Sequence, residues 1–281
     1  NGPELEHYPV DPDYNFSFDF DNPEVVKLPK KLKEISGLTG WKADGQLLAV
    51  QDEDGLFFVV DAASGDIVES FKFGKDRDYE GITRNEDTIY VLERDGDLHV
   101  IDYVPGQKEY QATKVETDFS YRNDTEGLVY EAYTNSLLIA PKENELSPNL
   151  GKYQRGIYRY HIASGITDPE PAYILDLMAI GKIIYGKQKP HLLKPSGVAI
   201  DPLTGDVYVI ASVGGILVVL SQDGELKHIE ILREKVFTQP EGICFDDSGN
   251  LYLSSEGRGG KGIVARLPRR PITGTNLKDN E

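Results

Sequence analysis

Short apolar runs separated by turn-forming residues make up most of the chain. Apolar and polar positions often alternate within these runs, and Val, Ile, Leu and Tyr are frequent, as in LFFVV (56–60), DTIYVLE (87–93) and GNLYLSS (249–255). This pattern predicts β-strands, and DSG at 247–249 has the composition of a hairpin turn. We therefore expect an all-β protein.

A short motif, a glutamate or serine followed by a glycine and apolar residues, precedes five of the predicted hairpins. The motif glycines are Gly37, Gly81, Gly127, Gly197 and Gly242, at intervals of 44, 46, 70 and 45 residues. Repeats of about 40–50 residues, each with four antiparallel strands, are typical of β-propellers. We predict a β-propeller with five blades of four antiparallel strands.

Closure of the ring is expected to join the two ends of the chain. The last unit ends after its third strand (GIVARLP, 262–268), and the apolar segment 24–29 is expected to add the missing outer strand. The N- and C-terminal strands would then pair in one blade. A sixth blade would require further strands between residues 128 and 196.

The domain organisation follows from the same count. We expect one propeller domain at 23–269, with polar tails at 1–22 and 270–281 that wrap loosely or are disordered. The long interval between the third and fourth glycines predicts insertions at 143–154 and 172–189, and the second contains apolar positions that suggest a short helix. Long loops on a rigid scaffold often carry function.

Acidic residues recur at one end of the predicted hairpins. In a propeller the first strand of each blade lines the central channel, so three glutamates should begin inner strands on a common face: Glu80, Glu126 and Glu241. The second strand returns to that face and ends there in further acids: Asp52, Glu53, Glu93, Glu143 and Glu256. Ser36 and Ser196 replace the motif glutamate in the other two units. We therefore predict an acidic rim around the channel.

Carboxylates that converge in this way repel one another, by about 1–4 kcal/mol per pair at ~4 Å. A hard cation such as Ca²⁺ relieves this repulsion by taking oxygen ligands. Protonation of carboxylates with raised pKa values, as in acid–base pairs, is a second remedy. Pairing with Arg94, Lys142 or Arg258, which are close in sequence, is a third. The residues alone leave all three open.

Composition limits the kinds of partner and binding site that the protein can have. Asp and Glu number 47 against 30 Lys and Arg, for a formal net charge of −17, which argues against binding to nucleic acid or anionic lipid. A single cysteine, Cys244, excludes an intrachain disulfide, and no apolar stretch is long enough to span a membrane. The five histidines are scattered without an H-x-H or HExxH pair, so the sequence predicts no zinc site. We expect a monomer.

Three units carry a family resemblance: FTQPEGICFDDSGNLYLSSE (237–256), DYEGIT (78–83) and NDTEGLVYEAYTNSLLIAPKE (123–143). They resemble the SdiA-regulated family, a distant relative of NHL-repeat propellers, and the resemblance extends over about residues 30–268. It implies a five-bladed propeller with a calcium ion near its centre, in bacterial proteins that are exported or membrane-anchored. No activity is implied. Matching the motifs implies that the ligands include Glu80, Glu126 and Glu241, with Glu143 and Glu256 behind them.

Two functions follow as hypotheses. The first is an extracytoplasmic calcium-binding module, periplasmic or at the cell surface and lipid-anchored in its precursor, which holds a small molecule or protein at the channel face. The start at Asn1 rather than Met and the single cysteine agree with export of a trimmed chain. The alternative is a metal-dependent phosphoesterase or lactonase that uses the same acids. Phosphate binding needs several basic groups, and Arg94, Lys142 and Arg258 are the only candidates nearby, so binding is favoured.

Overall fold

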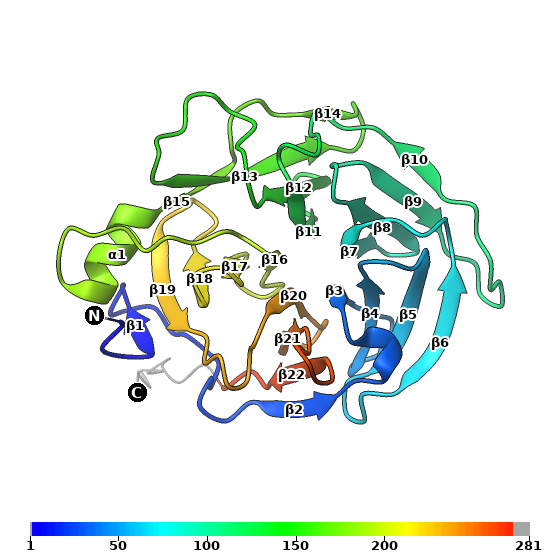
Figure 1. Ribbon diagram of the computed structural model, residues 1–281, viewed down its shortest axis with the longest axis horizontal. Coiled ribbons are helices and arrows are strands. Elements are labelled where there is room, and N and C mark those ends of the chain that lie inside the picture. Colours follow the sequence, from blue (N-terminus) through cyan, green and yellow to red (C-terminus); the bar gives the residue numbers. More distant parts are fainter. Residues whose placement is uncertain (1, 272–281) are drawn as a thin grey trace, which may run out of the picture.

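Five antiparallel sheets surround a central channel (Figure 1). The computed structural model describes residues 2–271. The first blade consists of β3 (Ile35–Gly40), β4 (Gln46–Gln51), β5 (Leu56–Asp61) and β6 (Ile67–Lys72). The second consists of β7 (Tyr79–Asn85), β8 (Thr88–Glu93), β9 (Leu98–Asp102) and β10 (Thr113–Val115). In each blade the first strand lies nearest the channel.

The third and fourth blades each carry one strand more than four. The third consists of β11 (Thr125–Glu131), β12 (Ser136–Pro141), β13 (Gln154–His161), β14 (Ile166–Thr167) and β15 (Tyr173–Asp176). The fourth consists of β16 (Gly197–Ile200), β17 (Val207–Ala211), β18 (Ile216–Leu220), β19 (Leu226–Ile231) and, outermost, β1 (His7–Pro9). Both β14 and β15 pair with β13, so the extra strands of the long interval extend the third blade and form no sixth.

The fifth blade combines β20 (Pro240–Phe245), β21 (Leu251–Ser255) and β22 (Ile263–Leu267) with β2 (Glu24–Lys27). The outer strand β2 comes from near the start of the chain and runs antiparallel to β22. The prediction of an all-β propeller with five blades of antiparallel strands is confirmed.

The motif glycines allow the inner strands to approach one another closely. A Cβ atom on Gly37 would lie 2.9 Å from Cα of Gly81, and one on Gly197 would lie 2.6 Å from the carbonyl oxygen of Glu241. Contacts this short do not occur between ordinary side chains and backbone, so any larger residue would push neighbouring blades apart. The repeated glycine therefore sets the narrow width of the channel.

Apolar side chains point to both faces of each blade because neighbouring blades cover both faces. Between the first two blades, for example, Trp41, Phe57, Phe71 and Tyr79 belong to one buried cluster. Burying a large apolar side chain contributes roughly 1.5–3 kcal/mol. The packing between blades gives the acidic residues of the channel a rigid frame.

The N-terminal segment differs from the expected loose tail. Its strand β1 extends the fourth blade by pairing with β19, and Phe18 and Phe20 are buried. Phe16 stacks on His228, with ring centroids 3.8 Å apart. The prediction was wrong because the polar composition of residues 1–22 hides three aromatic residues at alternate positions, all of which pack against the ring. The predicted C-terminal tail lies, from residue 272 onward, outside the described residues.

The second insertion contains the predicted short helix, α1 (Leu177–Tyr185). The Asp176 side chain caps its first turn by accepting hydrogen bonds from two backbone amides, and Gly186 ends it in the left-handed conformation. Its buried face, which includes Ile180 and Ile184, packs at the outer edge of the ring (Figure 1). Among residues 2–271, no helix is long and apolar enough to cross a membrane.

Candidate metal centre

One mouth of the channel holds a cavity of about 240 Å³ lined almost entirely by polar side chains. We call it the acidic mouth and define it by its lining residues: Asp52, Asp78, Glu80, Arg94, Asp124, Glu126, Lys142, Gln239, Glu241 and Glu256. Seven of these are carboxylates and two are cationic. The prediction that acids from several blades gather on one rim is thus met by the geometry.

An irregularity of the strands turns the motif side chains toward the channel. The pairing register shifts between Tyr79 and Gly81 in the second blade, so that Glu80 has no partner across the ladder. The same shift occurs at Glu126 and at Glu241. A bulge of this kind re-aims the extra residue, and here it directs each glutamate into the space between the inner strands.

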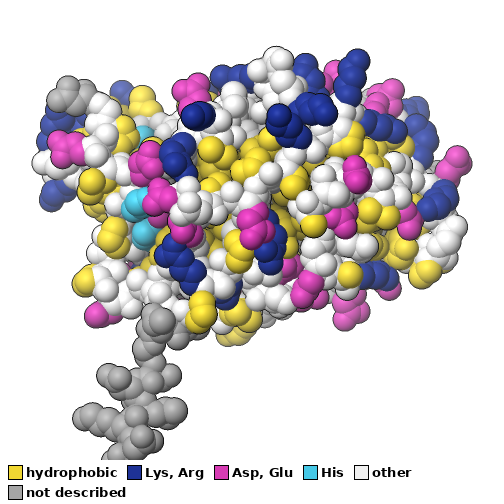
Figure 2. All heavy atoms as spheres, turned by 90° about the horizontal axis from the view of Figure 1, so that it is seen from below, with side chains coloured by type: hydrophobic (Ala, Val, Ile, Leu, Met, Phe, Trp, Pro, Cys, Tyr) yellow, Lys and Arg dark blue, Asp and Glu magenta, His cyan; other side chains and the backbone are white. Residues whose placement is uncertain are grey.

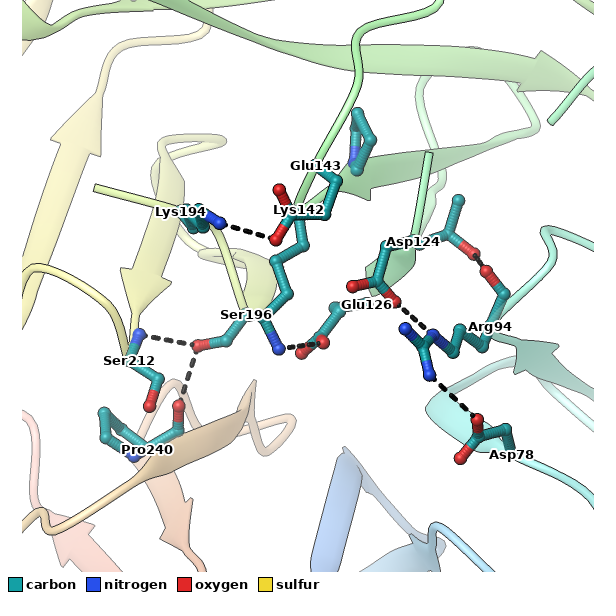
Figure 3. A network of polar contacts seen from close by, with 12 residues as sticks. Asp78, Arg94, Asp124, Glu126, Lys142, Glu143, Lys194, Ser196, Ser212 and Pro240 are labelled. Atoms are coloured by element: carbon teal, nitrogen blue, oxygen red, sulfur yellow. Dashed lines mark hydrogen bonds and ion pairs between the residues drawn. The ribbon is translucent and has the colours of Figure 1, made fainter. Parts of the chain in front are cut away.

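In the units without a motif glutamate, serine connects neighbouring blades. The hydroxyl of Ser36 donates to the carbonyl of Tyr79 at 2.6 Å, and that of Ser196 donates to the carbonyl of Pro240 at 2.7 Å (Figure 3). Each hydroxyl therefore joins its own inner strand to the next one around the ring. These positions stabilise the ring and add no charge to the acidic mouth.

Two basic side chains offset part of the negative charge. Lys142, which follows β12, donates from Nζ to Oε1 of Glu126 at 2.6 Å (Figure 3). Arg94 lies between two aspartates, with Nε 2.6 Å from Oδ1 of Asp124 and Nη1 3.4 Å from Oδ2 of Asp78. Both cations are thus held by carboxylates, and more acids than bases remain.

The acids of the cavity that have no basic partner have raised pKa values. Burial, followed by the charge of Glu126, raises the pKa of Glu80 to about 9. The same two causes raise the pKa of Glu241 well above its ordinary value, and its buried Oε2 atom has no hydrogen-bond partner in the described part of the chain. Burial also raises the pKa of Glu256 to about 7 and that of Asp52 to about 6, with neighbouring acids adding to both. Without a further cation, this cavity therefore favours bound protons.

The donor set fits a hard cation. All seven acidic donors are carboxylate oxygens, joined by the amide oxygen of Gln239, and no histidine or cysteine lines the cavity. The buried Oε2 of Glu241, which has no hydrogen-bond partner among residues 2–271, fits the role of a cation ligand. Among the described residues, however, oxygens within 4.8 Å of one another occur at the edge of the cavity, on Glu34, Asp52 and Glu53, and not on the three motif glutamates together. For the three motif glutamates to bind one cation, their side chains must move closer together and Lys142 must move away from Glu126.

The structure brings together four of the five predicted site residues: Glu80, Glu126, Glu241 and Glu256. Glu143 lies outside the acidic mouth, where it is half-exposed and accepts a hydrogen bond from Lys194 at 2.5 Å (Figure 3). Consecutive residues of an extended chain point to opposite sides, and its neighbour Lys142 takes the place toward the channel.

Other predicted rim residues have different partners. Glu93 is fully buried behind the cavity, where it contacts Arg77 and His99. Arg258, one of the three bases considered as partners for the acids, donates instead from Nε to the amide oxygen of Gln239 at 2.8 Å.

Sequence reasoning missed two lining residues: Asp124 and Gln239. Like Asp78, each lies two positions before a motif glutamate, in DYEG, DTEG and QPEG. Side chains two apart on a strand share a face, so aligning the repeats at this position would have found them.

The opposite mouth of the channel has a different character. A cavity of about 310 Å³ is lined there by apolar ends of the inner strands, including Leu38, Ile82 and Leu128, together with Arg84. The Arg84 guanidinium donates to the carbonyls of Gly40, Trp41 and Glu86, so it braces the loops. Three acids, Glu86, Asp246 and Asp247, also line this cavity, but the acidic mouth holds seven, so the carboxylates are concentrated at that end of the channel.

Solved structures with similar architecture include several enzymes. The glutaminyl cyclase of Myxococcus xanthus has a TM-score of 0.59 at 12% identity, covering 88% of this chain and 95% of that one. A luciferin-regenerating enzyme has a TM-score of 0.53 at 13% identity over 88% and 95%. The gluconolactonase XC5397 of Xanthomonas campestris has a TM-score of 0.51 at 11% identity over 95% and 97%. At such identities the likeness concerns the fold alone.

Comparison by sequence gives a more specific result than comparison by fold. No curated protein matches the chain significantly. A family profile, in contrast, matches residues 13–258, which include all five motif glycines and the whole acidic mouth. The chain belongs to the SdiA-regulated family.

Proposed function

We propose that the protein binds Ca²⁺ at the acidic mouth and uses that end of the ring to hold a small molecule or protein. The observation that carries this proposal is the buried Glu241 carboxylate, whose Oε2 atom has no hydrogen-bond partner among the described residues while Glu80 and Glu126 crowd the same cavity. Burying carboxylates without compensation costs several kcal/mol, and natural proteins retain such an arrangement where it serves a site.

The chemistry of the donors supports calcium in particular. Ca²⁺ takes six to eight oxygen ligands in flexible geometry, and the acidic mouth offers carboxylate and amide oxygens from four blades. When bound, the ion would supply the positive charge that Lys142 and Arg94 only partly provide. Glu80, Glu126 and Glu241 would hold it from within the channel, and Glu256 and Asp52 from its edge. Ligand positions that face solvent would remain for an oxygen of the partner.

An extracytoplasmic location accords with this proposal. Calcium sites of modest affinity are filled outside the cytoplasm, where the ion is abundant. The charge of −17 also suits a protein that meets cations. We therefore propose a location in the periplasm or at the cell surface.

A metal-dependent hydrolase is the second candidate, and one observation favours it. The pKa of Glu256 is raised to about 7 by burial and neighbouring acids, which suits a general acid or base near neutral pH. Against it, Lys142 and Arg94 are the only cationic groups lining the acidic mouth, and carboxylates occupy both. An anionic substrate would find little positive charge, so binding is the stronger proposal.

The test is thermal unfolding of chelator-treated protein with Ca²⁺ added back. A ligand that binds only the folded state at 100 times its Kd stabilises it by about 2.7 kcal/mol, so the melting temperature should rise. Glu241→Gln should lose most of this rise. The matched control is Glu143→Gln, which changes an exposed acid just outside the cavity and should keep it. A rise of equal size in both variants would overturn the assignment of the site.

The two candidate functions are separated by turnover. Phosphoester and lactone substrates should be tested with Ca²⁺ present, with Glu256→Gln as the comparison. The binding proposal expects no turnover above that of the variant. Turnover that depends on both Ca²⁺ and Glu256 would establish the hydrolase instead.

A further inference from the structure

A second cluster of ligand-type side chains lies on the outside of the ring, where the N-terminal segment meets the fourth blade. Figure 2 shows histidine side chains next to acidic ones at the left of this face, in the region of β1 and the fourth blade. Glu6, His7 and Asp21 each place one ligand atom within 4.8 Å of the others. None of these residues belongs to the acidic mouth.

The orientation of His7 is fixed by a buried carboxylate. Its Nδ1 atom lies 2.5 Å from Oε2 of Glu230, whose side chain is only 2% exposed. The other oxygen of Glu230 lies 2.6 Å from Nε2 of His228, so the carboxylate is itself held in place. When Nδ1 donates its proton to Glu230, Nε2 carries the free lone pair, and this atom lies next to Asp21. Histidines that ligate metals are commonly oriented by a carboxylate in this way.

The other nitrogen of the His7 ring, Nε2, lies near two more carboxylates. Nε2 of His7 lies 3.2 Å from Oδ2 of Asp21. Glu6, adjacent in sequence, completes the group and forms an ion pair with Arg233, whose Nε lies 3.8 Å from Oε2 of Glu6. The two acids therefore face the imidazole from different segments of the chain.

We propose that Glu6, His7 and Asp21 form a site for a borderline divalent cation of the Zn²⁺ class. One imidazole nitrogen with two carboxylate oxygens is a donor set that suits zinc and its neighbours, whereas the all-oxygen acidic mouth suits calcium. Three protein ligands leave a position open for water or a group of a partner. The bound ion would tie residues 6–7 to residue 21 and hold both ends of the N-terminal segment on the fourth blade.

The proton is the natural competitor for this site. Burial lowers the pKa of His7, but the hydrogen bonds and charges of Glu230 and Asp21 outweigh it and the pKa is raised. Metal binding should therefore strengthen as pH rises and His7 loses its proton. A protonated His7 between two acids, with no metal affinity, is the alternative that the experiment must separate.

The experiment is calorimetric titration of Zn²⁺ into metal-stripped protein in the presence of excess Ca²⁺, which occupies the acidic mouth. We expect one site whose affinity falls at least about tenfold in His7→Gln and in Asp21→Asn. The matched control is His161→Gln, because His161 forms a comparable exposed pair with Asp168 at 2.9 Å, and no third ligand joins this pair among the described residues. Absence of binding, or equal binding in His7→Gln, would overturn the proposal. So would an effect of His7→Gln without one of Asp21→Asn.

A spectroscopic measurement guards against indirect effects of the substitutions. Cu²⁺ at this site should show coupling to one nitrogen in its electron paramagnetic resonance spectrum, lost in His7→Gln, while melting curves report whether each variant folds. A spectrum without nitrogen coupling would contradict the site. Glu241→Gln should bind Zn²⁺ normally, so failure of the calcium proposal and failure of this one are distinguishable.

Discussion

Replacing Glu80 by Gln should make the calcium-free protein more stable, although it removes a residue of the site. Burial and the charge of Glu126 raise the pKa of Glu80 to about 9, against an ordinary value of 4.5. At pH values between these two, the folded protein binds a proton that the unfolded chain does not. The free energy of unfolding of the native protein therefore falls as pH rises through this window, and a neutral glutamine escapes that loss.

The magnitude follows from the width of the window. Each pH unit above 4.5 costs about 1.4 kcal/mol while the proton stays bound. At pH 7, which is 2.5 units above 4.5, this amounts to about 3.5 kcal/mol. The gain in Glu80→Gln should thus be near zero at about pH 4.5 and rise to at most about 3.5 kcal/mol at pH 7. With Ca²⁺ present the native protein should instead be more stable than Glu80→Gln, because it gains binding energy that the variant lacks.

The assay is urea unfolding in the presence of a chelator, followed by the fluorescence of Trp41, the single tryptophan, which is buried between the first two blades. Glu143→Gln serves as the control, because Lys194 lowers the pKa of Glu143 and its removal should give no gain. A loss of stability in Glu80→Gln at pH 7, or a gain that does not change with pH, would refute the reasoning.

Three further predictions concern the frame of the site. Lys142→Met leaves the buried Glu126 carboxylate without its partner, so the free energy of unfolding in urea with chelator should fall by about 3–5 kcal/mol at pH 8. At pH 5 Glu126 can take a proton, so the fall should be smaller. An equal fall at both pH values would contradict the pairing. Gly197→Ala places a Cβ atom 2.6 Å from a backbone carbonyl and should cost roughly 1–3 kcal/mol by the same assay, whereas Gly260→Ala, in open space, should cost little. Phe18→Ala should cost roughly 3–5 kcal/mol, and a cost no larger than that of the exposed Leu5→Ala would show that the N-terminal segment does not stabilise the ring.

The blade count was predictable because several signals agree. Alternating apolar runs, turn residues and a glycine at nearly constant spacing all follow from one repeated unit. The glycine has a steric cause, since a side chain on Gly37 or Gly197 would strike the neighbouring inner strand. Because each of these signals reflects a requirement of the folded blade, the pattern predicts the blade count correctly.

The site was predictable only as far as it follows the repeat. Glu80, Glu126 and Glu241 occupy equivalent positions, and the bulge at each turns them the same way. Whether Lys142 or Glu143 faces the channel depends on the direction of one extended residue at the end of β12, which composition does not encode.

Contacts between distant segments were not accessible from the sequence. His7 and Glu230 are 223 positions apart, and the three-residue strand that brings them together has no recognisable strand pattern. Aromatic residues at alternate positions in the N-terminal segment were the available signal, and the polar residues around them concealed it.

The most direct test of the central claim is calorimetric titration of Ca²⁺ at pH 7 in two buffers with different ionisation enthalpies, which measures protons released on binding. Glu80 and Glu241 have pKa values raised by burial and by the charge of Glu126, so the metal-free site holds protons that the ion must displace. The account predicts saturable binding with release of about one proton or more, abolished in Glu241→Gln. Absence of binding, or binding without proton release, would contradict it.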